Sequence, residues 1–549
     1  MAIHKPIGLI LSFFLLFLIK INGAQVLCPT NERQALLSFK KGVVTDKANR
    51  LSSWVGANCC QWKGVACNNS TGHVVKLDLR NPFPSNSDQA IQVREVNSSL
   101  LELKYLNYLD LSYNKFTDIT IPTFFGSFKA LEYLNLSYSE FSGLIPHSLG
   151  NLSALHTLDL SGDSDIYDDY IPYLEVDNLH WTSNLVSLKF LDLSGIPLYD
   201  SNGDSSPVIS SIPSLLELHM AYCYLGLGTP FRAPANLSSI LVLDLSNNDD
   251  RKFDVDEGYN GPIPDSVRNM KTLKSLDLSR NKFLSNGGVF GDLNNLHSLE
   301  TLDLTGNSFQ GDPFGKFTSL SFKNTIHTIR LTENKINVSI SPLFGSLTSL
   351  KELHLGINRF TGNVPTSFVS LKSLEVLELN ANDLSGSLPS FLNALSSLRT
   401  LDFYANGFTG GIPASYGALS NLEFLDLSYN QLNGGIPLSL QKLSKLKNLL
   451  VHDNKLTGQI PVSIGELSNL VALDISNNKL SGRIPMSITQ LSNLRDYNVS
   501  YNALSGPIPS SKKIPITNDP SVYIGNSKLC GPPLPNECEE AETGTSSQD

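Results

Sequence analysis

The sequence of 549 residues lacks the usual signatures of catalysis. It has no His-Glu-x-x-His zinc motif, no P-loop, no Gly-x-Ser-x-Gly motif and no Cys-x-x-Cys pair. Gly226-Leu227-Gly228 begins a dinucleotide-like pattern but the third glycine is missing. The ten histidines are scattered along the chain. We therefore expect a protein that is not an enzyme and that holds no cofactor.

Charge is sparse, and positive charge is the scarcer sign. The chain has 41 Lys and Arg against 51 Asp and Glu, so its net charge is -10, and charged residues make up 17% of it. This balance argues against binding to nucleic acid or to an anionic membrane surface. The 39 Gly and 29 Pro suit a fold that is dense in turns.

Long apolar runs are missing beyond the first residues. After residue 24 none reaches the ~18 residues that a membrane-spanning helix needs. Residues 1–24 have a charged start at Lys5, an apolar run from Ile7 to Ile19, and small residues at Gly23 and Ala24. This pattern predicts a signal peptide and a secreted protein.

The stretch 347–509 repeats with a period of 24 residues. The repeat is L-x-x-L-x-x-L-x-L-x-x-N-x-L-x-G-x-I-P, which is complete in residues 419–437. Its asparagine recurs at Asn334, Asn358, Asn382, Asn406, Asn430, Asn454, Asn478 and Asn502. A period in this range with an L-x-L-x-x-N core is the leucine-rich repeat signature.

Each repeat predicts a short strand followed by a turn. Leu425 and Leu427 alternate with a polar residue, which indicates a strand with one buried face. We expect the amide of Asn430 to bond backbone groups of its turn and of the next repeat. Stacked repeats bury a continuous core. The sequence therefore predicts an α/β leucine-rich repeat solenoid of about seventeen repeats, a curved superhelix with a parallel concave sheet and disulfide-bonded caps at both ends.

The domain organisation follows from the repeat. Residues 25–71 are expected to form an N-terminal cap, with a helix that Asn31 caps and that buries Ala35, Leu36 and Phe39. Repeats fill 72–509 and are irregular to about residue 340. A C-terminal cap is expected over 510–538 and an acidic disordered tail over 539–549.

Insertions interrupt the irregular repeats at about 163–184, 198–211 and 249–260. The second and third are rich in aspartate, including Asp200, Asp204, Asp254 and Asp256. A calcium loop is one interpretation. The order D-x-[DN]-x-[DN]-G is absent, so solvated surface insertions are favoured.

Six of the seven cysteines lie in the two caps, at Cys28, Cys59, Cys60, Cys67, Cys530 and Cys538. In a secreted chain they should form disulfides, although the four N-terminal cysteines allow three pairings. A metal site is the alternative, but these cysteines lack the spacing of zinc ligands. Cys223 stands at the asparagine position of its repeat, which predicts a buried thiol.

Several segments resemble plant extracellular leucine-rich repeat proteins. The resemblance rests on Leu51–Trp54 with Cys59–Cys67, on the recurring Gly-x-Ile-Pro element, and on the C-terminal Tyr523–Cys538. Leu174–Trp181 and Leu215–Cys223 are similar to the receptor-like proteins that perceive a fungal xylanase. The resemblance implies the pairs Cys28–Cys59, Cys60–Cys67 and Cys530–Cys538.

The same resemblance implies an extracellular protein of plant defence signalling that recognises a protein, peptide or glycan. It also implies a receptor-kinase co-receptor as a partner, met around Asn454 to Asn502. The transmembrane helix and the irregular island of these receptors have no counterpart here, so a shortened version is expected. Its expected place is the cell wall or apoplast, or the outer face of the plasma membrane. The alternatives are a secreted inhibitor of microbial wall-degrading enzymes and a soluble decoy of a longer receptor.

Departures from the common strand sequence Leu-Asp-Leu-Ser cluster in the six repeats from 326 to 454. They mix aromatic and apolar side chains with both charge signs, as protein interfaces do. Drift on a tolerant surface is the alternative, and the histidines suggest a pH dependence. The candidate ligand-binding residues are Arg330, Glu333, His354, Ile357, Glu378, Asp402, Tyr404, Phe424, Leu450 and His452.

Carboxylates recur in the strands, at Asp110, Asp159, Asp192, Asp244, Asp277, Asp303, Asp426 and Asp474. A row of acids could indicate glycoside chemistry, but a polar wall made by a repeated sequence is the favoured interpretation. Eight glycosylation sequons occur, at Asn68, Asn69, Asn97, Asn135, Asn151, Asn236, Asn337 and Asn498. None of them lies on the strands of the candidate surface.

Overall fold

The computed structural model describes residues 27–85, 87–162, 174–198, 212–223, 225, 239–248, 262–285, 288–509 and 519–538. The chain forms two units, Met1–Leu198 and Tyr199–Asp549, called unit 1 and unit 2 below. The predicted signal peptide, the acidic tail, sequon Asn236 and the aspartates of the second and third insertions lie outside the described residues. No helix within these ranges is long and apolar enough to cross a membrane.

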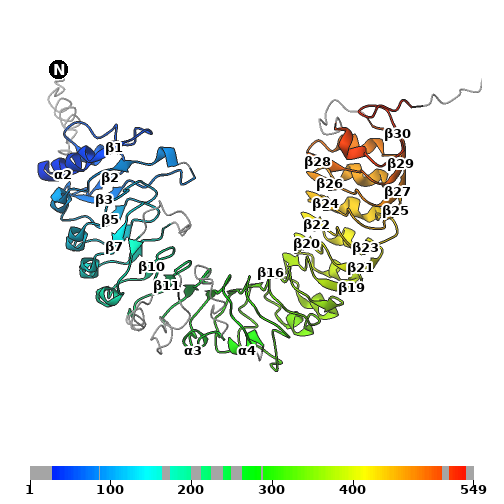
Figure 1. Ribbon diagram of the computed structural model, residues 1–549, viewed down its shortest axis with the longest axis horizontal. Coiled ribbons are helices and arrows are strands. Elements are labelled where there is room, and N and C mark those ends of the chain that lie inside the picture. The colour runs from blue at the N-terminus through cyan, green and yellow to red at the C-terminus, as the bar shows by residue number, and fades with distance from the viewer. Residues whose placement is uncertain are drawn as a thin grey trace, which may run out of the picture. The chain divides into compact units, whose positions relative to one another are not determined.

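Unit 1 begins with a cap and continues as parallel strands (Figure 1). Helix α2 spans Thr30–Lys41. Strand β2 pairs antiparallel with β3, after which β3, β5, β6, β8 and β10 pair in parallel order. The strands are β1 (Val43–Thr45), β2 (Val65–Cys67), β3 (Val74–Asp78), β4 (Gln92–Val93), β5 (Tyr108–Asp110), β6 (Tyr133–Asn135), β7 (Gly143–Leu144), β8 (Thr157–Asp159), β9 (Leu174–Glu175) and β10 (Phe190–Asp192).

Unit 2 carries one long parallel ladder and two short helices, α3 (Asp265–Arg268) and α4 (Val289–Asp292). The ladder strands are β11 (Glu217–His219), β12 (Val242–Asp244), β13 (Ser275–Asp277), β14 (Thr301–Asp303), β15 (Thr328–Arg330), β16 (Glu352–His354), β18 (Val376–Glu378), β20 (Thr400–Asp402), β22 (Phe424–Asp426), β24 (Asn448–Leu450), β26 (Ala472–Asp474) and β28 (Asp496–Asn498). With the five parallel strands of unit 1, the described residues hold seventeen such strands, which confirms the expected repeat number.

A second set of strands runs along the other side of the regular repeats (Figure 1). They are β17 (Thr361–Gly362), β19 (Asp383–Ser387), β21 (Gly407–Gly410), β23 (Gln431–Leu432), β25 (Thr457–Gln459), β27 (Lys479–Gly482), β29 (Ala503–Pro507) and β30 (Lys528–Cys530). The two sets are joined through 3-10 turns such as Leu438–Lys442 and Val462–Glu466. Each second strand begins within three residues after an asparagine of its repeat, for example β23 after Asn430 and β27 after Asn478.

The cap helix differs from the sequence expectation at its start. It begins at Thr30 after Pro29, so Asn31 lies inside it and no side chain caps it. Asn31 instead donates to a carboxylate oxygen of Glu102, at 2.7 Å. Glu32 is buried beside Ala35, Leu36 and Phe39, and it accepts the backbone N–H of Val74 at 2.7 Å. The helix thus fastens to β3 through a buried carboxylate.

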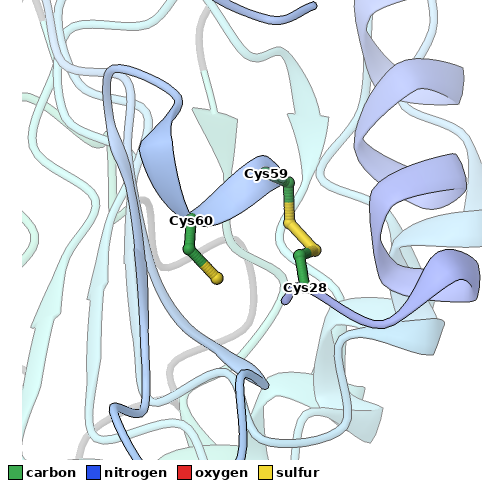
Figure 2. Close-up of side chains that lie close together, drawn as sticks. All are labelled: Cys28, Cys59 and Cys60. Carbon is green, nitrogen blue, oxygen red and sulfur yellow. A yellow bond between two sulfur atoms is a disulfide. The ribbon is translucent and has the colours of Figure 1, made fainter. Parts of the chain in front are cut away.

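Disulfides close both ends of the chain. The pairs are Cys28–Cys59, Cys60–Cys67 and Cys530–Cys538, which are the pairs that the resemblance implied. The sulfur atoms of Cys28, Cys59 and Cys60 lie within 4.8 Å of one another (Figure 2). All three already belong to disulfides, so they offer no thiolate to a metal ion. Cys223 is fully buried, and its thiol lies 3.5 Å from the Ala221 carbonyl oxygen.

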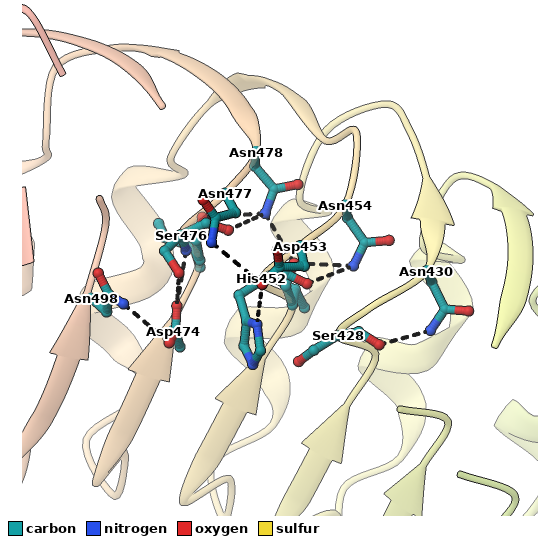
Figure 3. A network of polar contacts seen from close by, with 12 residues as sticks. Ser428, Asn430, His452, Asp453, Asn454, Asp474, Ser476, Asn477, Asn478 and Asn498 are labelled. Atoms are coloured by element: carbon teal, nitrogen blue, oxygen red, sulfur yellow. Dashed lines mark hydrogen bonds and ion pairs between the residues drawn. The ribbon is translucent and has the colours of Figure 1, made fainter. Parts of the chain in front are cut away.

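The repeats are held together by a leucine core and by a ladder of asparagines. The amide nitrogen of Asn430 donates to the carbonyls of Leu427 and Ser428 in its own turn, at 3.1 and 3.0 Å. It also donates to the Phe403 carbonyl at 2.9 Å, and its oxygen accepts the Phe408 N–H at 3.0 Å. Asn454 and Asn478 repeat the arrangement (Figure 3).

These bonds correct one expectation. The asparagine side chains bond to the preceding repeat, since Phe403 and Phe408 come before Asn430 in the chain. The pattern of residues had predicted a bond to the next repeat. The chain turns at the asparagine, and the asparagine side chain faces backbone groups of the preceding repeat. The ladder therefore ties every repeat to the one before it.

The residue before each ladder asparagine has a left-handed backbone. Most occupants are polar, aromatic or alanine, but Ile357 has φ +48 and its side chain is 50% exposed. A β-branched residue is unfavourable there because its Cβ crowds the following carbonyl. The structure thus displays an apolar side chain in a strained position beside β16.

We predict that Asn430→Ala destabilises the fold by about 3 kcal/mol, because buried carbonyls and an N–H lose their partners. Chemical denaturation followed by circular dichroism measures this. Asn433→Ala is the matched control, since Asn433 lies in the same repeat but is exposed, and it should change stability little. Equal losses in the two variants would contradict the ladder.

We predict that Ile357→Asn raises the free energy of unfolding by about 1 kcal/mol, because asparagine tolerates the left-handed backbone. Ile524→Asn is the control, since Ile524 is 49% exposed but has φ -52. The same denaturation experiment should show no gain for Ile524→Asn. A gain in both variants would mean that exposure rather than strain is relieved.

Candidate ligand-binding surface

Five of the ten candidate residues fall into register on the unit 2 ladder, namely Arg330, His354, Glu378, Asp402 and Leu450. The third residues of the strands align as Asp303, Arg330, His354, Glu378, Asp402, Asp426, Leu450, Asp474 and Asn498, a row called the central lane below. The second residue of each strand is buried, so this row faces away from the core. Neighbouring strands lie about 4.8 Å apart, which brings successive side chains of the lane into contact range.

An ion-pair chain occupies the first part of the lane. Arg330 contacts the carboxylate of Glu352 at 2.7 Å and that of Asp303 at 3.9 Å. The His354 ring lies between two carboxylates, with Nδ1 2.5 Å from Glu378 and Nε2 3.6 Å from Glu352. The candidate residues Arg330, His354 and Glu378 therefore act as one connected group.

The next part of the lane is acidic and incompletely satisfied. Asp426 accepts both the N–H and the hydroxyl of Ser428, at 2.8 and 2.5 Å. Asp402 accepts the N–H of Tyr404 at 2.9 Å, but a tyrosine stands where other repeats supply the serine hydroxyl. Burial, followed by the charges of Asp426 and Glu378, raises the pKa of Asp402 to about 7, against the opposing effect of the Tyr404 N–H. Asp402 thus lacks the serine hydroxyl that Asp426 has, and its carboxyl group is about half protonated near pH 7, so it can accept a hydrogen bond from a ligand or donate one.

Aromatic side chains gather beside this acidic segment. Tyr404 and Tyr429 meet edge to face with ring centroids 5.3 Å apart, and Tyr429 meets the His452 ring in the same way at 5.3 Å. Tyr404 is 36% and Tyr429 is 49% exposed. His452 Nδ1 lies 2.9 Å from the carboxylate of Asp453 (Figure 3). The cluster offers exposed ring edges next to carboxylates, a combination that suits peptide recognition.

Leu450 links the lane to a cavity of about 440 Å³ at the C-terminal end of the ladder. The cavity extends over β26, β28 and the 3-10 turn Pro520–Tyr523. Its polar walls come from Asp474, Arg495, Asp496, Asn498, Asp519 and Ser521. Asp474 accepts the Ser476 hydroxyl at 2.6 Å and lies 3.3 Å from the amide of Asn498 (Figure 3).

Three candidate residues lie apart from these groups. Phe424 begins β22, in register with Thr400 and Asn448 rather than with the lane. Glu333 and Ile357 lie in the turns that follow β15 and β16.

Sequence reasoning missed Glu352 and Tyr429. Glu352 is in register with Thr328 at the start of its strand, so only the side-chain contact with Arg330 reveals its role. Tyr429 belongs to a Leu-Ser-Tyr-Asn sequence that recurs along the chain, which hid it as ordinary repeat sequence.

The described sequons divide by exposure. Asn68, Asn69, Asn151 and Asn337 are exposed, and Asn97 is half-buried. The asparagines of the two strand sequons form side-chain hydrogen bonds. The amide of Asn135 donates to Asp159 at 3.0 Å, and the amide of Asn498 donates to Asp474 at 3.3 Å. Glycosylation is therefore expected first at the exposed sites.

The raised pKa of Asp402 predicts a pH-dependent stability. Because its folded pKa of about 7 exceeds the unfolded value of about 4, this contribution is greatest in acid and is lost as the pH rises from about 4 to about 7. Asp402→Asn should therefore gain stability over the unmodified protein as the pH rises through that window. Denaturation curves at several pH values measure the difference.

Asp474→Asn is the control for this pH series. It keeps an oxygen that accepts the Ser476 hydroxyl, as Asn135 does for Ser137 in its own repeat, so it should change stability little at neutral pH. A stability difference for Asp402→Asn that does not change with pH would contradict the account of Asp402.

Family models match at both the cap and the repeats. The leucine rich repeat N-terminal domain matches residues 29–68. Leucine rich repeat models match residues 104–164, 269–291, 298–320, 421–443 and 469–491. These matches agree with the cap and the ladder strands described above.

Two structures of plant receptors are similar to the chain. The structure of PEPR1-AtPEP1 is 30% identical, with a TM-score of 0.56 and coverage of 88% of this chain and 60% of that one. The plant peptide hormone receptor RGFR1 in complex with RGF2 is 26% identical, with a TM-score of 0.55 and coverage of 82% and 62%.

Two curated relatives from Solanum lycopersicum have similar sequences. Receptor-like protein EIX1 is 37% identical over 378 residues, covering 62% of this chain and 35% of the relative. Receptor-like protein EIX2 is 37% identical over 369 residues, covering 62% and 34%. The chain thus spans about a third of the length of these relatives. With its cap, its repeats and these relatives, the chain is similar to the plant leucine-rich repeat receptor-like proteins.

Proposed function

We propose that the protein is a secreted, non-catalytic recognition protein of plant defence, which binds a peptide, protein or glycan ligand on the unit 2 ladder. The observation that carries the proposal is the continuity of the surface. Substitutions scattered over 120 residues of sequence, from Arg330 to Leu450, fall into one row of adjacent strands. The repeat brings these positions together, and the pairing of Arg330 and His354 with carboxylates of neighbouring strands favours a selected surface over drift.

The chemistry of the surface favours a peptide or a protein segment as the ligand. The central lane offers a cation at Arg330, a carboxylate open to a donor at Asp402, and an apolar side chain at Leu450 within a single row. Tyr404 and Tyr429 add exposed rings. PEPR1 and RGFR1 have similar folds, and the latter is a peptide hormone receptor.

A receptor kinase is the proposed partner, because the resemblance to receptor-like proteins implies one. The C-terminal repeats around Asn454 to Asn502, beside the cavity of about 440 Å³, are the proposed meeting place. The proposed location is the cell wall space or the outer face of the plasma membrane, with glycans on the exposed sequons.

The test compares the protein with a variant that carries Arg330→Gln, His354→Asn, Tyr404→Ser and Leu450→Asn. Asparagine and serine occupy the equivalent positions of other repeats, so the fold should survive. Each immobilised protein is exposed to extracellular fluid from infected tissue, and bound species are quantified by mass spectrometry. We predict at least a ~10-fold loss of a specific ligand in the variant, because the substitutions remove its central contacts.

The matched control carries Leu438→Ser, Val462→Ser and Met486→Ser, three exposed apolar residues in the 3-10 turns. It should retain the ligand as well as the unmodified protein does. Equal capture by all three proteins would contradict the proposed surface. If the captured species is a wall-degrading enzyme that loses activity on binding, the protein is an inhibitor instead.

A further inference from the structure

A basic cavity lies in the cap of unit 1, far along the sequence from the candidate surface. It has a volume of about 390 Å³ and is lined only by residues between Arg50 and Pro82. Its charged lining consists of Arg50, Lys63, Lys76, Arg80 and Asp78. Gly64, Val65, Ala66, Leu79 and Pro82 form the rest of the wall.

The antiparallel pairing of β2 and β3 builds this cavity. It brings the start of β2 beside the end of β3, where the Asp78 N–H donates to the Gly64 carbonyl at 2.7 Å. Gly64 has φ +83, and a Cβ there would lie 2.4 Å from the Asp78 carbonyl oxygen. The close approach allowed by this glycine places Lys63 beside the charged end of β3.

The charges in the cavity do not balance. One carboxylate faces four cations, and Asp78 is shared between Lys76 at 3.2 Å and Arg80 at 3.5 Å. Lys76 also lies over the Tyr108 ring, 3.9 Å from its centroid. An excess of positive charge within one cavity is notable in a chain whose net charge is -10, because the cations repel one another unless an anion joins them.

Arg50 is the most informative member of the group. It is 7% exposed, and its guanidinium donates to Asn114 at 2.8 Å and to the carbonyls of Leu79 and Arg80. All these acceptors are neutral, and no carboxylate among the described residues lies within 4.0 Å of it. The nearby Asp46 carboxylate accepts the N–H groups of Arg50 and Leu51.

Burial therefore lowers the pKa of Arg50, although the charges of Asp46 and Asp78 oppose this. A buried cation whose charge is not directly paired is unfavourable, and an anion in the cavity would relieve it.

We propose that this cavity binds an oxyanion, either a small multivalent anion or the sulfate, phosphate or carboxylate group of a larger ligand. Exposed Lys63 and Arg80 at its mouth supply charged donors to the oxygens, and Arg50 holds the floor. The site is separate from the unit 2 surface, so it gives the protein a second binding function that is independent of the proposed one.

The test measures the melting temperature of the unmodified protein, and its tryptophan emission, against inorganic sulfate and against citrate at low ionic strength. Trp54 donates its indole N–H to the Lys63 carbonyl at 2.9 Å and stacks on Trp62, so its emission reports on the cavity. Both signals should saturate with at least one of the anions. A response to sulfate alone assigns a tetrahedral oxyanion, and a response to citrate alone assigns carboxylates.

The variant Lys63→Gln with Arg80→Gln should weaken the binding at least ~10-fold, because two charged donors are lost. Both side chains are exposed, so the fold should persist, which circular dichroism checks. Lys189→Gln, at an exposed lysine of unit 1 outside the cavity, is the matched control and should bind like the unmodified protein. No saturable response to either anion, or the same affinity in the double variant, would overturn the proposal.

Discussion

The structure depends on the hydrogen bonds that each ladder asparagine makes with the repeat before it. The amide of Asn430, for example, satisfies two carbonyls of its own turn, and a carbonyl and an N–H of the preceding repeat, while its side chain is buried. The asparagine contacts reinforce the register of the parallel strands, since they require one backbone alignment between neighbouring turns.

Because the register is the same in every repeat, the residues that stabilise the fold and those that form the surface occupy different strand positions. The second residue of each strand belongs to the core, while most third residues are at least partly exposed on the ladder. Where the repeat has Asp followed two residues later by Ser, as at Asp426 and Asp474, the serine hydroxyl donates a hydrogen bond to the carboxylate. Where that pattern breaks, at Tyr404, an incompletely satisfied carboxylate is left behind. Substitutions in this Asp and Ser pattern can therefore create a ligand-binding surface while the buried strand positions stay unchanged.

Much of this arrangement could be predicted from the sequence. The period of 24 residues placed the regular strands and the ladder asparagines, because each repeat contains its own complete set of core positions. The row from Arg330 to Leu450 followed from the same alternation. The predicted partner repeat of the Asn430 side chain was wrong, because a residue pattern does not say which neighbouring repeat a turn faces.

Other features depend on contacts between side chains, which the period does not encode. The bond of Glu32 in the cap helix to the backbone of Val74 is a contact between residues distant in sequence. The role of Glu352 beside Arg330 and His354, and the burial of Arg50, are of the same kind. The irregular insertions lack the period altogether, so sequence reasoning had no frame for them.

The central claim is that the unit 2 ladder meets the ligand through its departures from the common repeat. Site-specific photo-crosslinking tests it most directly, with benzoylphenylalanine placed at Tyr404 and, for comparison, at Tyr138, an exposed tyrosine of unit 1. After irradiation in extracellular fluid, the account predicts a discrete covalent adduct from position 404 and none from position 138. No adduct at position 404, or the same adduct from both positions, would contradict it.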